Sequence, residues 1–187
     1  LGRSSRDGHL VASDALLRSR GVERFEVDRG GDVTFHGPGQ LVGYPIIDLK
    51  RHKQDLHWYL RQVEEALIVA VQAFGISATR NAGFTGVWVD GRKLASIGVH
   101  ARDWVTWHGF ALNVTTDLSY FDLIVPCGIQ DVVMTSVARE VARGGTGDTP
   151  ARSVVTRAVV EGFSQIFALE AEAITRDDLT LDLDFAV

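Results

Sequence analysis

The sequence has a single cysteine and no long apolar run. Because Cys127 stands alone, it cannot form an internal disulfide, which excludes a small disulfide scaffold and fits a reducing compartment. The longest apolar run, around residues 66–74, contains Gln72 and falls far short of the ~20 residues that cross a bilayer. We therefore expect a cytoplasmic protein without a membrane anchor.

The sequence also lacks an excess of positive charge. It has 24 acidic and 19 basic residues and a net charge of -5, the opposite of the balance that favours binding to a polyanion. Nucleic acid is therefore not an expected partner. Hydrophobic residues at 45% and charged residues at 23% are typical of a globular chain. The length predicts a single domain over residues 1–187.

The hydrophobic pattern predicts an α+β fold with a mixed, largely antiparallel sheet flanked by helices. Residues 54–74 carry apolar side chains at intervals of three or four, which predicts a long helix. Asp90-Gly91 predicts a tight hairpin turn. Thr149 and Pro150 are typical of the N-cap and first residue of another long helix, ending near residue 169. The shorter predicted elements are a helix at 13–20, strands at 22–29, 33–36, 41–47, 87–89, 93–99 and 104–114, and a strand or loose end at 177–187.

Cys127 is a candidate nucleophile. It lies between Pro126 and Gly128, which predicts a turn rather than a packed helix face. A glycine beside a nucleophile lets a backbone N–H approach a developing oxyanion. A free thiol has a pKa of ~8.5 and is mostly protonated at neutral pH, so this role needs a nearby cation or base. The alternative is a buried cysteine that acts as a small hydrophobic residue.

Lys93 is the candidate for that cation. The chain has three lysines against sixteen arginines, and only Lys93 lies in an apolar strand. An ammonium group can give up a proton and take it back, whereas a guanidinium cannot release one. The alternative is a solvated lysine that follows a hairpin turn.

The histidines and glycine loops do not indicate a cofactor. His36, His100 and His108 do not match the spacing of a zinc motif, so we expect no metal and interpret them as hydrogen-bonded histidines. The loops at 29–31 and 37–39 lack the lysine and helix N-terminus of a phosphate-binding loop. No nucleotide site is therefore expected.

Residues 29–45, RGGDVTFHGPGQLVGYP, resemble the signature of the octanoyl-[acyl-carrier-protein]:protein octanoyltransferases, also called lipoyl(octanoyl) transferases. Residues 93–99, 108–114, 125–129 and 135–136 follow in that family's order. The resemblance runs from about residue 1 to 170. It implies a fold like the catalytic domain of biotin and lipoate protein ligases.

The resemblance implies roles for particular residues. Cys127 would be the nucleophile that carries the acyl thioester, and Lys93 would be its partner in a catalytic dyad. The acyl pocket would be lined by three segments of the chain. These are Arg29, Gly30, Gly31, Asp32, Val33, Thr34, Phe35 and His36, then Ser96, Ile97 and Gly98, and then Gly109, Phe110 and Ala111.

The implied reaction is the first step of endogenous protein lipoylation. An octanoyl group passes from octanoyl-acyl carrier protein to a lysine of lipoyl domains, in 2-oxoacid dehydrogenase complexes and the glycine cleavage H protein. Backbone N–H groups near Gly128 and at 96–98 are candidate oxyanion donors. Because a thioester is already activated, we expect no ATP and no other cofactor. We expect a monomer.

Two alternatives to this reading stay open. The first is an ATP-dependent lipoate protein ligase, which has a similar fold but needs a site for an acyl-adenylate. The sequence shows no signature of such a site. The other is a truncated, non-catalytic module that binds lipoyl domains. The reason to consider such a module is that members of the family carry a further N-terminal segment. Only the end of that segment resembles residues of this chain, at positions 1–3. We expect the chain to lack that segment, which would leave an unpaired sheet edge and a partly open acyl pocket.

Overall fold

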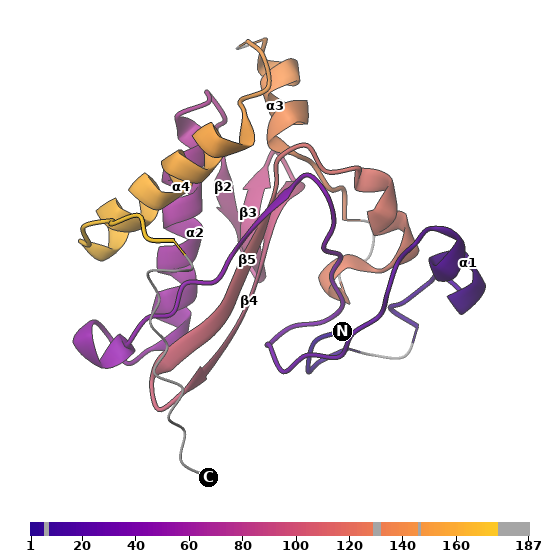
Figure 1. The fold of residues 1–187 in the computed structure, drawn as a ribbon, viewed down its shortest axis with the longest axis horizontal. Coiled ribbons are helices and arrows are strands. Elements are labelled where there is room, and N and C mark those ends of the chain that lie inside the picture. Colours follow the sequence, from indigo (N-terminus) through magenta and orange to yellow (C-terminus); the bar gives the residue numbers. More distant parts are fainter. Residues whose placement is uncertain (6–7, 129–131, 146, 176–187) are drawn as a thin grey trace.

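The computed structural model describes residues 1–5, 8–128, 132–145 and 147–175, and its centre is a five-stranded sheet (Figure 1). The strand order is β1-β5-β4-β3-β2, and all four pairings are antiparallel. A parallel bridge joins Lys93 to Met134. The expected α+β fold with a largely antiparallel sheet is therefore confirmed. The strands are β1 (Gln40–Gly43), β2 (Thr79–Asn81), β3 (Phe84–Val89), β4 (Arg92–Arg102) and β5 (Val105–Asn113).

Helices and irregular segments cover the two sides of this sheet. Figure 1 shows α2 and α4 side by side along one side, and the segments before β1 and after β5 on the other. No helix of the described part is long and apolar enough to cross a membrane. The α-helices are α1 (Asp14–Ser19), α2 (Leu56–Gln72), α3 (Val137–Gly144) and α4 (Arg152–Phe167), and the 3-10 helices are η1 (Leu49–Arg51), η2 (Leu118–Leu123) and η3 (Pro126–Gly128).

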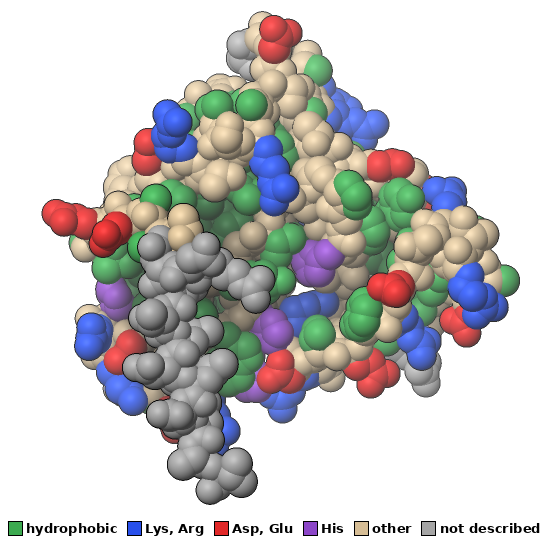
Figure 2. All heavy atoms as spheres, in the orientation of Figure 1, with side chains coloured by type: hydrophobic (Ala, Val, Ile, Leu, Met, Phe, Trp, Pro, Cys, Tyr) green, Lys and Arg blue, Asp and Glu red, His purple; other side chains and the backbone are tan. Residues whose placement is uncertain are grey.

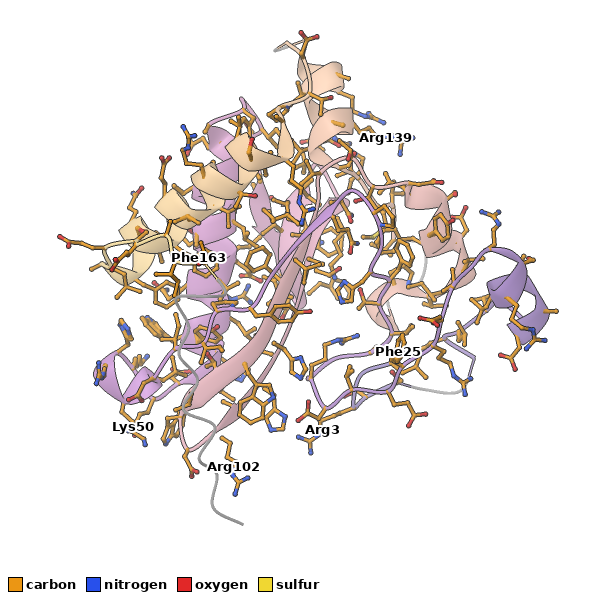
Figure 3. All side chains as sticks on the ribbon, viewed as in Figure 1. Arg3, Phe25, Lys50, Arg102, Arg139 and Phe163 are labelled. Atoms are coloured by element: carbon orange, nitrogen blue, oxygen red, sulfur yellow. The ribbon has the colours of Figure 1, made fainter. Side chains whose placement is uncertain are left out.

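Each side of the sheet has its own hydrophobic cluster. The larger one packs α2 and α4 against the sheet, where Phe163, labelled on α4 in Figure 3, stacks on Phe110 of β5 with ring centroids 5.6 Å apart. The smaller one holds Leu17 and Val33 against Phe121. Phe25, labelled in the same figure, belongs to the segment on that second side. The space that concerns function lies between this segment and the sheet.

Local signals explain the strongest elements. The carboxylate of Asp55 accepts a hydrogen bond from the backbone N–H of Trp58 at 3.0 Å and caps α2. Asp90 and Gly91 have φ of 44° and 78° and form the expected turn between β3 and β4. The β4–β5 turn uses Asp103 and Trp104, which both have a positive φ.

Two of the predicted strands are wrong. Residues 22–29 and 33–36 form no strand; they cross the open side of the sheet and line a cavity. Their backbones are held at single points, as where the N–H of Gly30 donates to the carbonyl of Val99 at 2.9 Å. Alternating apolar side chains here face a cavity and not a sheet neighbour, so the same pattern arises without strand pairing.

Several boundaries also differ. Strand β1 ends at Gly43, because Pro45 lacks the N–H that a longer ladder needs. Helix α4 begins at Arg152 after Ala151, so Thr149 is not its cap. Helix α3 was not predicted, although Ser136 caps it. The predicted element at 177–187 lies outside the described residues.

Candidate active site

A cavity of about 600 Å³ lies between the sheet and the segment that precedes β1. Figure 2 shows an opening in this part of the surface, with histidine side chains at its edge. The cavity collects every residue expected in the acyl pocket except Gly30, Gly31 and Asp32. The expected residues that line it are Arg29, Val33, Thr34, Phe35, His36, Ser96, Ile97, Gly98, Gly109, Phe110 and Ala111.

Sequence reasoning missed a large part of the apolar lining. The missed residues come mainly from the segment before the glycine loop and from the η2 region. The signal that could have found the first group is the pattern of Val22, Phe25 and Val27, which predicts a strand from sequence alone. The missed apolar residues are Leu1, Leu10, Leu17, Val22, Phe25, Val27, Val42, Tyr44, Tyr120, Leu123 and Ile124.

Glycines let the loop at 29–31 lie directly on the sheet. Gly98 pairs with Gly109 across β4 and β5. A Cβ on Gly98 would come within 3.0 Å of the side chain of Arg29 and the carbonyl of Gly30. Gly30 and Gly31 therefore help to form the close contact between loop and sheet while lying outside the cavity lining.

Lys93 is one of the most deeply buried polar residues, with 1% of its surface exposed. Its backbone N–H donates to the carbonyl of Val133 at 2.8 Å, and its carbonyl accepts from the N–H of Thr135 at 2.9 Å. Its Nζ lies 5.2 Å from the centroid of the Trp88 ring, a distance at which the ring face attracts a cation. The reading of Lys93 as a solvated strand residue is therefore wrong.

Gly86 makes room for the side chain of Lys93. A Cβ on Gly86 would come within 2.8 Å of Cε of Lys93 and 2.6 Å of the carbonyl of Ala95, and its φ is +140°. The backbone N–H of Gly86 donates to Oε1 of Glu64 at 2.9 Å. This fixes β3 at the residue that faces the lysine.

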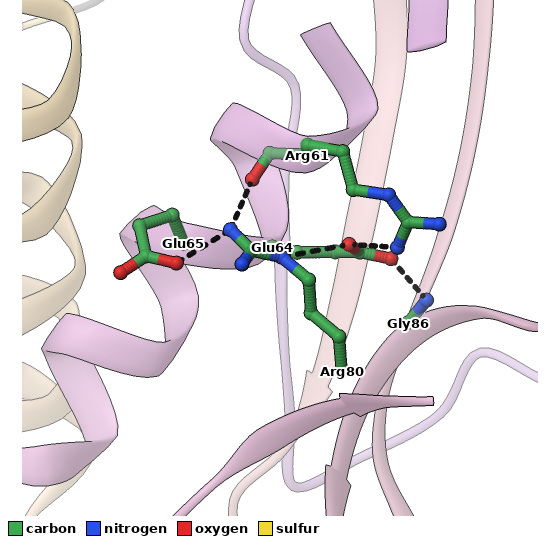
Figure 4. A network of polar contacts seen from close by, with 5 residues as sticks. All are labelled: Arg61, Glu64, Glu65, Arg80 and Gly86. Atoms are coloured by element: carbon green, nitrogen blue, oxygen red, sulfur yellow. Dashed lines mark hydrogen bonds and ion pairs between the residues drawn. The ribbon is translucent and has the colours of Figure 1, made fainter. Parts of the chain in front are cut away.

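A fully buried carboxylate anchors that contact. Oε2 of Glu64 lies 2.6 Å from a guanidinium nitrogen of Arg61 and 3.3 Å from one of Arg80 (Figure 4). Arg80 also contacts Glu65 at 2.5 Å. Because both arginines compensate the buried charge, Glu64 can hold the Gly86 amide without an unpaired carboxylate in the core.

Cys127 lies in the short 3-10 turn η3, as its neighbours Pro126 and Gly128 predict. The structure describes the backbone of Cys127, and its side chain lies outside that description, so the pairing with Lys93 stays a prediction. The N–H of Gly128 donates to the carbonyl of Val125 at 3.0 Å. That N–H is therefore engaged in the turn, and the expected oxyanion donors near Gly128 and at 96–98 stay a prediction.

Asp32 lies against this turn and not in the cavity lining. Its Oδ2 is 2.5 Å from Nδ1 of His9, and its Oδ1 accepts from the N–H of Val33 at 2.7 Å. A Cβ on Gly128 would lie 2.7 Å from Oδ2 of Asp32. The placement of Asp32 differs from that of its neighbours 33–36, which line the cavity.

A line of buried hydrogen bonds begins at the cavity with His36. Its Nδ1 donates to Oε1 of Gln40 at 3.1 Å, since Nε2 of Gln40 donates to Phe35 and to Asn113. Burial of the imidazole lowers the pKa of His36, the bond to Gln40 opposes this, and the positive charge of Arg29 adds to the lowering. The imidazole of His36 in the cavity wall is therefore neutral at neutral pH.

His100 and His108 meet at the carboxylate of Asp28. Nε2 of His108 lies 2.6 Å from Oδ1 of Asp28, and Nδ1 of His100 lies 3.2 Å from its Oδ2. The hydrogen bond from His108 is the main cause that lowers the pKa of Asp28. Within the described ranges, no group of three or more histidine, cysteine or acidic residues is arranged to hold a metal ion.

Comparison with known sequences gives the family. The lipoyl protein ligase A/B catalytic domain model matches residues 1–164. An octanoyltransferase of Rubrobacter xylanophilus is 50% identical over 168 residues, which cover 89% of this chain and 73% of that protein. An octanoyltransferase of Cytophaga hutchinsonii is 44% identical over 181 residues, which cover 94% of this chain and 72% of that protein. A chloroplastic octanoyltransferase of Arabidopsis thaliana is 48% identical over 164 residues, 85% and 59%.

Comparison with solved structures supports the fold. Lipoate-protein ligase A bound with ATP has a TM-score of 0.67 at 16% identity, covering 89% of this chain and 68% of that one. A structure from an archaeal lipoylation system, the bipartite lipoate protein ligase and E2 lipoyl domain of Thermoplasma acidophilum, has a TM-score of 0.60 at 18% identity, covering 87% and 65%. These likenesses confirm the expected ligase-type fold. With the sequence identities, they show that the chain belongs to the octanoyltransferases of the lipoyl protein ligase A/B catalytic-domain family.

Proposed function

We propose that this octanoyltransferase takes its octanoyl group from octanoyl-acyl carrier protein and passes it to a lysine of a lipoyl domain through a thioester on Cys127. The observation that carries the proposal is the cavity of about 600 Å³, whose lining includes residues close in sequence to Lys93 and to Cys127. Ser96, Ile97 and Gly98 continue the strand of Lys93. Ile124 lines the cavity two residues before the turn of Cys127 begins.

In the first step, the thiolate of Cys127 attacks the carbonyl carbon of the octanoyl thioester. The new carbon–sulfur bond forms as the bond to the pantetheine sulfur breaks, and the ammonium of Lys93 gives its proton to the leaving thiolate. The products are octanoyl-Cys127, neutral Lys93 and the free thiol of the carrier protein. Lys93 suits this step because a lysine, unlike an arginine, can release a proton and take it back.

In the second step, the amine of the acceptor lysine attacks the octanoyl thioester. Neutral Lys93 takes a proton from that amine, the amide bond forms, and the thiolate of Cys127 leaves. The dyad thereby returns to its starting protonation state. Such a cycle needs neither an external base nor a redox partner.

The cavity supplies the acyl specificity. Its size falls in the range of about 300–1,000 Å³ that is usual for small-molecule pockets, and apolar side chains from both sheet and loop line it. Burying one methylene contributes about 0.8 kcal/mol, so an eight-carbon chain gains most of its affinity here. We propose the residues expected for the acyl pocket in this role, except Asp32, which lies against the turn of Cys127, and with Gly30 and Gly31 acting through the loop contact and not through the lining.

The proposed donor and acceptors rest on the resemblance to the octanoyltransferase family. Since a thioester donor is already activated, the reaction needs no ATP. Lipoyl domains of 2-oxoacid dehydrogenase complexes and the glycine cleavage H protein are the proposed acceptors. The lone cysteine of the chain supports a reducing compartment, for which we propose the cytoplasm. We propose that the catalytic unit is a monomer.

The test is the intact mass of the protein after mixing with octanoyl-acyl carrier protein, and again after adding an unmodified lipoyl domain. We expect one octanoyl increment that maps to Cys127 and is discharged by the acceptor. Cys127→Ser and Lys93→Met should each abolish the increment. Lys53→Met is the matched control, because Lys53 is an exposed lysine paired with Asp55. Retained transfer in Cys127→Ser would overturn the scheme.

The same assay distinguishes octanoyl transfer from the reaction of an ATP-dependent ligase. If octanoate and ATP acylate the lipoyl domain without any carrier protein, the chain works as an ATP-dependent ligase. A folded protein that gains no increment with either donor, and still binds the lipoyl domain, would support the non-catalytic module.

A further inference from the structure

His9 and Asp32 come from two separate segments and meet beside the turn that contains Cys127. Nδ1 of His9 and Oδ2 of Asp32 are 2.5 Å apart, which is shorter than an ordinary N–H···O hydrogen bond. The carboxylate side chain is only 10% exposed and the imidazole 25%. Neither residue lines the acyl cavity, so the pair has no part in holding the acyl chain.

The pair contacts the residue that directly follows the cysteine. A Cβ on Gly128 would lie 2.7 Å from Oδ2 of Asp32 and 3.1 Å from Cε1 of His9. Only a residue without a Cβ allows this approach, and the φ of +67° at Gly128 favours glycine for the same position. The side chains of His9 and Asp32 therefore pack directly against the turn that contains Cys127.

The backbone of His9 holds the other end of the same turn. Its carbonyl accepts from the N–H of Val125 at 2.7 Å, and the carbonyl of Val125 accepts from Gly128 at 3.0 Å. An antiparallel bridge joins Leu10 to Ile124 next to it. The segment of His9 thus fixes the turn from its first residue, and the His9–Asp32 pair fixes it at its last.

Hydrogen bonds hold the carboxylate of Asp32 at both of its oxygens. Oδ2 is bonded to Nδ1 of His9, and Oδ1 accepts from the N–H of Val33. Val33 itself lines the cavity.

We propose that His9 and Asp32 are a positioning pair for the nucleophile, which hold Gly128 and thereby set Cys127 at the acyl cavity. The inference rests on the proposed function of Cys127. Neither residue touches the substrate. The pair acts through the turn, and a small displacement of a reacting group can lower a rate by about 100-fold.

The test compares His9→Ala, Asp32→Ala and the double variant in the rate of octanoyl-Cys127 formation. We expect each single change to slow this step by about 10- to 100-fold, and the double variant to be little slower than either single one, because the two residues act as a unit. The apparent KM for the donor should stay within about twofold, because the acyl cavity is intact. His57→Ala, an exposed histidine on α2, is the matched control.

A conservative change distinguishes positioning from proton transfer. In His9→Asn the side-chain amide can still donate to Asp32, since its nitrogen lies where Nδ1 lies in histidine. We expect this variant to recover the rate to within about threefold of the unsubstituted protein. A rate as low as that of His9→Ala, or single effects that multiply in the double variant, would overturn the inference.

Alkylation of Cys127 by iodoacetamide gives a second readout that needs no acyl donor. We expect His9→Ala to slow it by at least about threefold, with melting temperatures confirming that each variant is folded. Should His9→Ala fail to fold, Asp32→Asn, which keeps the shape of the side chain, takes its place. If the unsubstituted protein forms no acyl-enzyme, the proposed function fails. An unchanged alkylation rate in the folded variant would instead overturn the inference that His9 and Asp32 position Cys127.

Discussion

Nε2 of Gln40 lies 2.9 Å from Oδ1 of Asn113, its directly paired residue across β1 and β5. Nδ2 of Asn113 continues to the carbonyl of Thr135 at 3.0 Å. The N–H of Thr135 in turn donates to the carbonyl of Lys93. A buried line of hydrogen bonds thus runs from the cavity wall to the backbone of the proposed general acid. It holds two distant parts of the site in register.

Breaking that line should weaken the fold and the reaction together. Asn113→Ala leaves buried polar groups on Gln40 and Thr135 without their partner, which should lower the free energy of unfolding by about 1–3 kcal/mol. Denaturant unfolding measures the loss, and acyl-enzyme formation should slow in parallel. Gln72→Ala, at the exposed end of α2, is the control and should change stability by less than about 0.5 kcal/mol. Equal effects in both variants would contradict the role given to Asn113.

Gly86 offers a test of the space around Lys93. Gly86→Ala places a methyl group against Cε of Lys93, whereas at Gly83 nothing lies within 4 Å of an added Cβ. Both glycines have a positive φ, so both substitutions add backbone strain of about 1 kcal/mol. Only Gly86→Ala should also slow acylation, by more than about tenfold. Single-turnover rates decide this, and equal rates for the two variants would show that the lysine tolerates displacement.

The buried carboxylate of Glu64, beside Gly86, predicts that Glu64 and its neighbour Glu65 differ in their contribution to stability. Glu64→Ala removes the acceptor of the Gly86 amide and exposes two arginines to their mutual repulsion. We expect a loss of about 2 kcal/mol in unfolding free energy. Glu65→Ala removes one side-chain pair that is more than a third exposed, so its loss should stay below about 1 kcal/mol. A larger loss for Glu65→Ala would reverse the ranking that burial predicts.

Features encoded locally were predictable from the sequence. The long helix α2, with its cap at Asp55, and the hairpin at Asp90-Gly91 depend on residues within a few positions of each other. The strand predicted at 22–29 failed, because alternation of apolar residues cannot distinguish a sheet face from a cavity face. Helix α3 was missed although Ser136 and the left-handed Gly145 mark its two ends.

The site was predictable as a set of residues and not as an arrangement. Three segments assigned to the acyl pocket converge on one cavity, but Asp32 reaches His9 and Gly128 instead. His9 lies 23 positions from Asp32, and Gln40 lies 73 positions from Asn113. Contacts over such separations follow from the topology of the chain, which one sequence does not specify. The buried state of Glu64 was missed for the same reason, because its helical position alone resembles that of Glu65.

His36 predicts how stability depends on pH. Its folded pKa lies below the unfolded value of about 6.5, chiefly because the imidazole is buried and then because Arg29 is near. As pH falls through about 6.5, the unfolded chain binds a proton that the folded chain does not. The stabilisation is therefore fully present above that pH and is lost as pH falls toward the folded pKa.

Urea unfolding at about pH 7.5 and about pH 5.5 measures this contribution, because the window spans the titration of histidine. The free energy of unfolding should fall further toward the acidic pH in the unsubstituted protein than in His36→Gln. The hydrogen bond lost in that variant lowers stability at both pH values and so cancels in the comparison. His57→Gln, on the exposed side of α2, shows how much of the slope the loss of any one imidazole removes. If His36→Gln keeps the full slope, the burial of His36 does not set the acid sensitivity of the fold.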